Sequence, residues 1–160
     1  NIKSPDLIVK PELNDCLVLI CGMKHPFAKR KTIKLEELSN ENFAMREEGS
    51  GTRELFEEYM EKHKVAIKTV FVGNSPEGIK SEVIENNLLS VMSIGLVMKE
   101  VKNSTVHMIT NKDNAWNRYF SMVFHKDKVV TDIMKSLMNI IRDYQYIPTT
   151  MKYNTSILTR

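Results

Sequence analysis

Short apolar runs alternate with polar turns along the chain, a pattern that predicts a mixed α/β protein. The middle of the chain is the most regular part. Its predicted elements are a strand at 42–46, a helix at about 52–63, a strand at 65–73, a helix starting after Ser75 and a strand at 88–93. This order is typical of a parallel sheet with crossover helices, so the α/β class rests on connectivity as well as on composition.

Further elements are predicted on both sides of this region. They are strands at 7–10, 16–21, 105–110 and 118–125, and a helix at about 127–144. The last helix carries one apolar stripe, made of Val130, Ile133, Met134, Leu137, Ile140 and Ile141. The tail at 145–160 has no helical period, and we expect it to be loose.

Two helix starts carry the most informative local chemistry. In "REEGSGTRELFEEYM", Gly49 and Gly51 bracket Ser50, and Thr52 stands where a helix N-cap is expected. Capping alone explains the threonine, whereas two glycines beside a helix N-terminus also suit the approach of an anion to backbone amides. Both interpretations stay open on these residues. The second start has Ser75 as N-cap and proline at the first helical position.

Composition and charge restrict the class of protein. The chain has 160 residues and is 42% hydrophobic, which suits one compact domain or two small lobes. Its 23 basic and 20 acidic residues are too balanced for a nucleic-acid surface. The longest apolar run, "CLVLICGM", is much shorter than the roughly 20 residues of a membrane helix, so we expect a cytoplasmic protein with no membrane contact. The start, "NIKSPDLIVKP", reads as a piece of a longer protein.

The residue types that carry catalysis or bind metals form no recognisable motif. Cys16 and Cys21 lie five positions apart in a predicted strand, so their side chains face opposite ways and we expect buried, reduced thiols. The four histidines are scattered, and the serines lack a GxSxG motif. We therefore expect no catalytic residue, metal or cofactor, and we interpret Trp116 as a packing anchor.

The segment "HPFAKRKTIKLEELSNENFAMREEGSGTRELFEEYM" resembles the effector-binding domain of LysR-type transcriptional regulators. That family has "HPLA" after an apolar strand, a short "L.DL" segment and "REPGSGTR" before a helix, in this order. "VGNSPEGIKSEVIENNLLSVMS" is similar to the next block of the family. Where the family has Gly-Leu-Gly, this chain has "NNLL" at 86–89, and asparagine tolerates a left-handed backbone.

The resemblance implies a periplasmic-binding-protein-like (type 2) fold, with the second lobe complete and the first lobe only partly present. Residues 1–21 would then hold the end of the first lobe and the first crossing strand. The other predicted parts are the second lobe at 22–104, the return crossing and C-terminal part of the first lobe at 105–144, and the tail at 145–160. No enzymatic activity is implied.

The same resemblance places a small-molecule effector against the helix starts of the second lobe. The implied binding residues are Gly49, Ser50, Gly51, Thr52, Asn74 and Ser75. DNA would be bound only by a helix-turn-helix domain that precedes this segment, and the chain would form a homodimer, in part through the exposed stripe of the last helix. Two alternatives stay open, a solute-binding receptor of a transporter and an enzyme in which Arg46 or Arg53 neutralises a phosphate.

Overall fold

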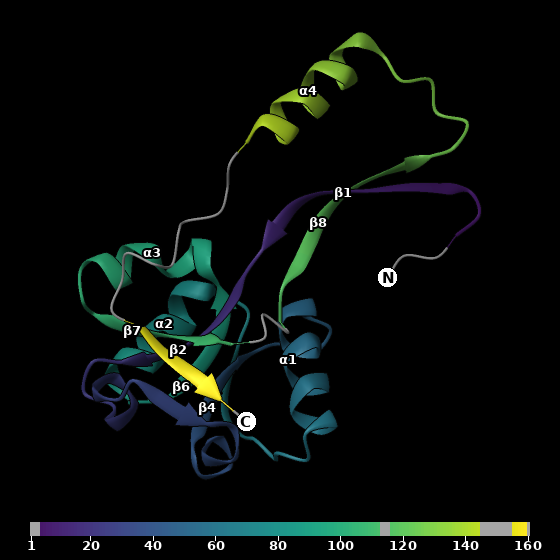
Figure 1. Ribbon diagram of the computed structural model, residues 1–160. Helices are drawn as coiled ribbons and strands as arrows, with labels where there is room; N and C mark the ends of the chain where they lie inside the picture. Colours follow the sequence, from purple (N-terminus) through teal and green to yellow (C-terminus); the bar gives the residue numbers. More distant parts are fainter. Residues whose placement is uncertain (1–3, 113–115, 145–154, 160) are drawn as a thin grey trace. The chain divides into compact units, whose positions relative to one another are not determined.

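A computed structural model describes residues 4–112, 116–144 and 155–159 (Figure 1). The chain divides into two compact units: unit 1 holds residues 1–15 and 117–147, and unit 2 holds residues 16–116 and 148–160. These limits differ from the predicted boundaries at 21/22 and 104/105. The physical reason is that residues 17–22 and 106–111 are interior strands of the sheet in unit 2.

Unit 2 is built on a seven-stranded sheet in the order β3-β9-β7-β2-β6-β4-β5. The strands are β2 (Leu17–Gly22), β3 (Thr32–Lys34), β4 (Asn42–Arg46), β5 (Lys68–Gly73), β6 (Leu89–Ser93), β7 (Val106–Asn111) and β9 (Thr155–Thr159). Strand β4 is parallel to both β5 and β6, which confirms the parallel arrangement predicted for the middle of the chain. Strand β2 is antiparallel to its two neighbours, β6 and β7.

Helices cover both faces of this sheet (Figure 1). Unit 2 contains the short 3₁₀ helices η1 (Pro26–Lys29) and η2 (Leu35–Asn40), and the α-helices α1 (Gly51–Lys62), α2 (Pro76–Glu85) and α3 (Ile94–Lys102). Phe56 of α1 packs on one face with Phe43 and Trp116. Ile79 of α2 and Val97 of α3 pack on the other face. The sheet therefore separates two apolar cores.

The two cysteines confirm the predicted alternation of strand faces. Cys21 belongs to the core under α1, whereas Cys16 packs against the core under α2 and α3, and the two do not form a disulfide. Cys21 is fully buried, and burial raises the pKa of its thiol to about 12, with a further contribution from the charge of Glu41. Cys16 is only half-buried, so the prediction that both side chains are buried was wrong for this one.

The three α-helices of unit 2 end in the same way. Each is followed by a residue with a left-handed backbone: Lys64 at φ 58°, Asn87 at φ 56° and Ser104 at φ 53°. After α1, for example, the Val65 amide donates to the Met60 carbonyl at 3.0 Å. This bond closes the helix end as in a Schellman motif. Asn87, in the "NNLL" segment, thus adopts the left-handed backbone that asparagine tolerates.

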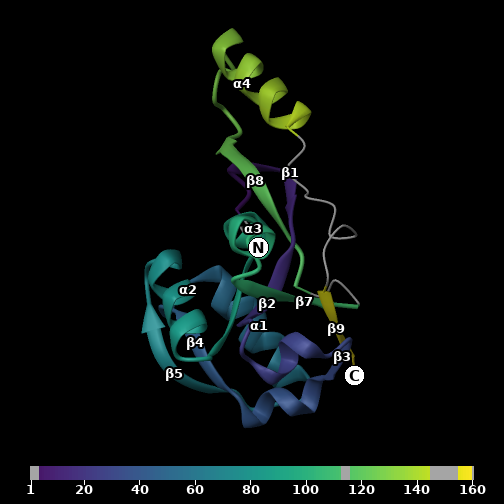
Figure 2. The ribbon, with the colours of Figure 1, turned by 90° about the vertical axis from the view of Figure 1, so that its left-hand side faces the viewer.

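Strand β9 is the main departure from the predicted elements of unit 2. It lies between β7 and β3, parallel to both (Figure 2). Buried Ser156 fixes it in place: its Oγ lies 2.8 Å from Nε2 of His107 and donates toward the carbonyls of Phe27 and Arg30. The prediction of a loose tail was therefore wrong for residues 155–159, while residues 145–154 lie outside the described residues.

Unit 1 consists of strands β1 (Leu7–Asp15) and β8 (Arg118–His125), which pair antiparallel, and helix α4 (Asp132–Asp143). Asp15 is fully buried and accepts a hydrogen bond from Nε of Arg118 at 2.9 Å. Helix α4 begins later than the predicted residue 127, because Thr131 is its N-cap and accepts from the Met134 amide at 3.3 Å.

The apolar residues of the predicted stripe differ in exposure. Val130, which precedes the N-cap Thr131, and Ile141 of α4 are half-buried, whereas Ile133, Leu137 and Ile140 are 83%, 56% and 67% exposed. The predicted exposed stripe of Val130, Ile133, Leu137 and Ile141 is therefore corrected to Ile133, Leu137 and Ile140. No residue of α4 is buried.

Candidate functional site

The two glycine- and serine-containing turns leave the sheet at the same edge. Strands β4 and β5 run parallel, and their last residues, Arg46 and Gly73, are paired. The turn at 47–50 follows one strand and the turn at 74–75 follows the other. Because neighbouring strands lie about 4.8 Å apart, the two turns start side by side.

The chain then diverges from this point toward opposite faces of the sheet. The first turn leads into α1, which packs on one face, and the second leads into α2, which packs on the other. A crevice forms between adjacent parallel strands whose following helices lie on opposite faces, and ligands of α/β proteins gather there. The carboxyl edge of β4 and β5 has this geometry.

The first turn has the backbone of an open loop. Gly49 has φ +81°, and a Cβ added to it would meet no atom within 4 Å. Ser50 is the N-cap of α1: its amide donates to Glu47 O at 3.2 Å and its carbonyl accepts from the Glu54 amide at 2.9 Å. The Ser50 side chain makes no capping hydrogen bond, so its half-buried hydroxyl is not used by the cap.

The prediction that Thr52 is the N-cap of α1 was wrong. Helix α1 begins at Gly51, so Thr52 is its second residue, and the Thr52 side chain is buried at 7% exposure. The glycine before it continues the helix without a side chain and moves the cap back to Ser50. The Thr52 side chain therefore packs beneath the turn and adds little to the surface that a ligand could contact.

The second turn confirms the predicted cap. Ser75 precedes α2, Pro76 is the first helical residue, and the Ser75 hydroxyl accepts from the Gly78 amide at 3.4 Å. Asn74 and Ser75 are both exposed. The first amides of α2 therefore lie beside exposed, short polar side chains at the edge of the crevice.

The two arginines around the first turn are each paired with a carboxylate. Arg46 donates to both carboxylate oxygens of Glu47 at 2.8 and 2.7 Å, and these bonds lower the pKa of Glu47 to about 2. Arg53 donates to Glu57 at 2.8 Å and to the carbonyl of Arg46 at 3.2 Å, which ties the helix to the end of β4. Both arginines are thus engaged with carboxylates, so an anion at this edge would meet the partial positive charge of helix N-termini rather than an unpaired arginine.

The structure brings Gly49, Ser50 and Gly51 to the same edge as Asn74 and Ser75, with Thr52 buried behind them. Sequence reasoning missed a third helix start, where Ser93 is the N-cap of α3 at the end of β6, on the other side of β4. The predicted elements include no helix between the strands at 88–93 and 105–110. A signal was present, since apolar residues at 94, 97, 98 and 101 follow Ser93 at helical spacing.

In the described part of the chain, no group of three or more His, Cys, Asp or Glu side chains is arranged to hold a metal ion. No helix within the same part of the chain is both long and apolar enough to cross a membrane.

Comparisons with known proteins agree on one family. Residues 1–145 match the family model of the LysR substrate binding domain. The chain is 29% identical over 118 residues to the HTH-type transcriptional regulator CysL of Bacillus subtilis, covering 74% of this chain and 40% of the relative. It is 26% identical over 136 residues to the activator CmpR of Synechocystis, covering 85% and 45%. The chain therefore spans less than half the length of these relatives.

Solved structures agree with the fold. The regulatory domain of CcmR from Synechocystis PCC6803, in complex with 2-PG, has a TM-score of 0.79 and 25% identity, and the match covers 89% of this chain and 68% of that one. The effector binding domain of QuiR in complex with shikimate has a TM-score of 0.72 at 16% identity, covering 87% and 65%. The fold is thus the periplasmic-binding-protein-like fold of these regulatory domains.

Proposed function

The chain belongs to the LysR substrate-binding domain family, and we propose that it senses a small effector for a DNA-binding transcriptional regulator. The observation that carries the proposal is the crevice at the carboxyl edge of β4 and β5, where two helices begin from paired strand ends. The relatives are transcriptional regulators, which favours regulation over transport or catalysis as the role of this crevice.

We propose that Gly49, Ser50, Gly51, Asn74 and Ser75 form one wall of the effector site, with Thr52 supporting it from beneath. The ligand would be a small organic anion held mainly by backbone amides and short hydroxyls. Helix N-termini favour negative charge, and both nearby arginines are already paired with carboxylates. The bound 2-PG of CcmR and shikimate of QuiR support a small ligand in this fold.

The test uses the complete regulator and substitutes Ser75→Asp. Aspartate caps a helix as well as serine does, so α2 is retained, while the added carboxylate repels an anion at the same amides. Thermal-shift screening with small carboxylates and phosphates identifies a ligand, and calorimetry measures its affinity. We expect Ser75→Asp to weaken binding at least about tenfold, which corresponds to ~1.4 kcal/mol.

The matched control is Thr131→Asp, which makes the same kind of change at the N-cap of α4 in unit 1. It should leave the affinity unchanged. A ligand that binds Ser75→Asp as tightly as the unsubstituted protein would show that the effector lies elsewhere. Preferential binding of cations or neutral apolar compounds would contradict the anionic class.

The same proposal includes assembly and location. The regulator would act as a homodimer in the cytoplasm, with DNA contacted by a domain outside this chain. The exposed side chains of Ile133, Leu137 and Ile140 support association, since apolar surface of this kind is removed from water when it packs on a partner.

A further inference from the structure

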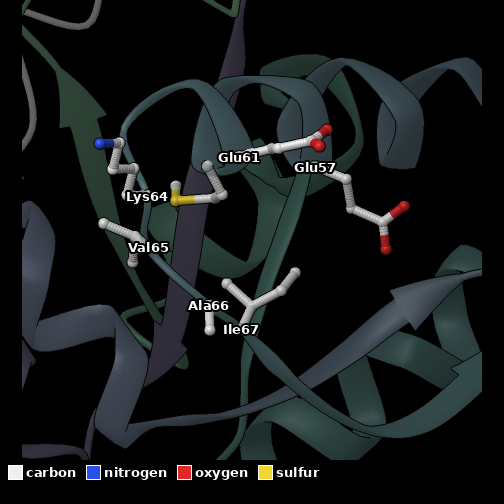
Figure 3. A pocket seen from close by; sticks show the side chains of 7 residues that line it. Glu57, Glu61, Lys64, Val65, Ala66 and Ile67 are labelled. Atoms are coloured by element: carbon white, nitrogen blue, oxygen red, sulfur yellow. The ribbon is translucent and has the colours of Figure 1, made fainter.

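Unit 2 has a second hollow, at the opposite end of α1 from the glycine turn. It has a volume of about 350 Å³ and lies where α1 ends and the chain returns toward β5 (Figure 3). A helix of 12 residues is about 18 Å long, so this hollow is well separated from the turns at the other end. Ligand-binding pockets commonly have volumes of about 300–1,000 Å³.

The hollow combines an apolar floor with charged side chains on its rim. Met60 and Val65, at 1% and 8% exposure, form part of the floor together with half-buried Ile67. Glu57 and Glu61 contribute carboxylates one helical turn apart. An apolar surface with a few polar groups along one side fits a ligand that has an apolar body and a polar head.

The arrangement of the charges selects the head group. Figure 3 shows the carboxylates of Glu57 and Glu61 on one side of the hollow and the ammonium of Lys64 on the opposite side. The C-terminus of α1 also carries partial negative charge, which favours a cation. Glu57 already binds Arg53, whereas the exposed Glu61 has no ion pair in the described part of the chain.

We propose that this hollow is a second ligand site of unit 2, for an organic amine with an apolar body. The ammonium would lie beside Glu61 and Glu57, and the apolar body would cover Met60, Val65 and Ile67. The site is distinct from the effector crevice, because most of the residues that line it belong to the C-terminal part of α1 or to the segment between α1 and β5.

The experiment compares two probes with the same apolar body and opposite charge, 3-phenylpropylammonium and 3-phenylpropionate. Each is titrated into the 160-residue chain at constant ionic strength, and the methyl resonances of Met60, Val65 and Ile67 are followed by NMR. We expect the ammonium to shift these resonances with an affinity about two- to fivefold higher than that of the carboxylate. An exposed ion pair contributes about 0.2–1 kcal/mol, and Glu61, Glu57 and the C-terminus of α1 together outweigh the single ammonium of Lys64 on the rim.

Three variants sharpen the test. Glu61→Gln should weaken binding of the ammonium about two- to fivefold and should not weaken binding of the carboxylate. Glu58→Gln removes an exposed charge from α1 outside the hollow and should change neither. Ala66→Phe places a ring at the exposed alanine that lines the hollow and should abolish binding of both probes.

Other outcomes would overturn the proposal. Equal affinities for the two probes would show that Glu57 and Glu61 do not distinguish a positive from a negative head group. Identical effects of Glu61→Gln and Glu58→Gln would show that the ammonium responds to the net charge of the chain and not to a carboxylate at the hollow. Shifts confined to residues outside the hollow would place the ligand elsewhere. The backbone spectrum of each variant establishes that a loss of binding is not a loss of fold.

Discussion

The helices of unit 2 and the helix of unit 1 use their apolar residues differently. Helix α1 buries Phe56 and Met60 completely, and α2 and α3 also place apolar side chains in the cores beneath them. Helix α4 buries none of its residues, although Ile133 and Leu137 are as apolar as any core residue. The apolar side chains of α1, α2 and α3 stabilise unit 2 from within, whereas those exposed on α4 are available for the association proposed above.

The largest expected effect tests this division directly. Phe56→Ala should destabilise unit 2 by about 3–5 kcal/mol, because it removes a ring that packs on Phe43 and Trp116 and leaves a cavity. Leu137→Ala, at an exposed position of α4, should change the stability of the dilute monomer by less than about 0.5 kcal/mol. Urea unfolding, followed by tryptophan fluorescence, measures both. Similar losses for the two variants would break the comparison.

The next effect concerns association. Replacing Ile133, Leu137 and Ile140 together by serine should shift a dimer to monomer, since each aliphatic side chain buried in an interface contributes on the order of 1.5–3 kcal/mol. Sedimentation equilibrium at micromolar concentration reports the change. Asn139→Ser, at another exposed position of α4, is the control and should leave the assembly intact. A chain that stays monomeric at high micromolar concentration would already contradict the proposed use of α4.

The sequence predicted the parts of the fold that depend on local pattern. The parallel strands around α1 and α2, the cap at Ser75 and the opposite faces of Cys16 and Cys21 all follow from periodicity and turn chemistry over a few residues. Strand β9 could not be found in this way. Its position between β7 and β3 depends on contacts with His107 and Arg30, which lie far away in the sequence.

The candidate site shows the same limit. The residues of the two turns were visible in the sequence, but the pairing of Arg46 with Gly73 that puts the turns side by side is a property of strand order. The cap was misplaced at Thr52 because both Ser50 and Thr52 are good N-cap residues, and the buried environment of Thr52 decides between them. The predicted stripe on α4 combined half-buried and exposed residues, because the sequence does not say which side of the helix packs against β1.

A smaller effect separates backbone conformation from packing within unit 2. Gly49→Ala should destabilise the protein by about 1–2 kcal/mol, because φ +81° is unfavourable for alanine while its Cβ meets no neighbouring atom. Gly78→Ala, in the first turn of α2, should instead stabilise by up to about 1 kcal/mol. Denaturant midpoints give both signs. Two changes of the same sign would show that the left-handed backbone at Gly49 does not limit stability.

The smallest expected effect is a pH dependence of the stability of unit 2. Burial lowers the pKa of His107, because a charged imidazole inside the sheet loses its hydration. Ser156 has one hydroxyl proton, which it directs to carbonyls, so Nε2 of neutral His107 is the donor to Ser156 Oγ. The unfolded chain therefore binds more protons than the folded chain below about pH 6.5, and the free energy of unfolding should decrease as the pH falls from 6.5 toward the lowered pKa.

His107→Gln keeps a hydrogen-bond donor but does not titrate. It should therefore make the free energy of unfolding depend less steeply on pH, whatever it does to stability at pH 7.5. Urea unfolding at pH 7.5 and 5 measures how much the free energy of unfolding changes. An equal change for His107→Gln and the unsubstituted chain would show that protonation of His107 beside β9 does not affect stability.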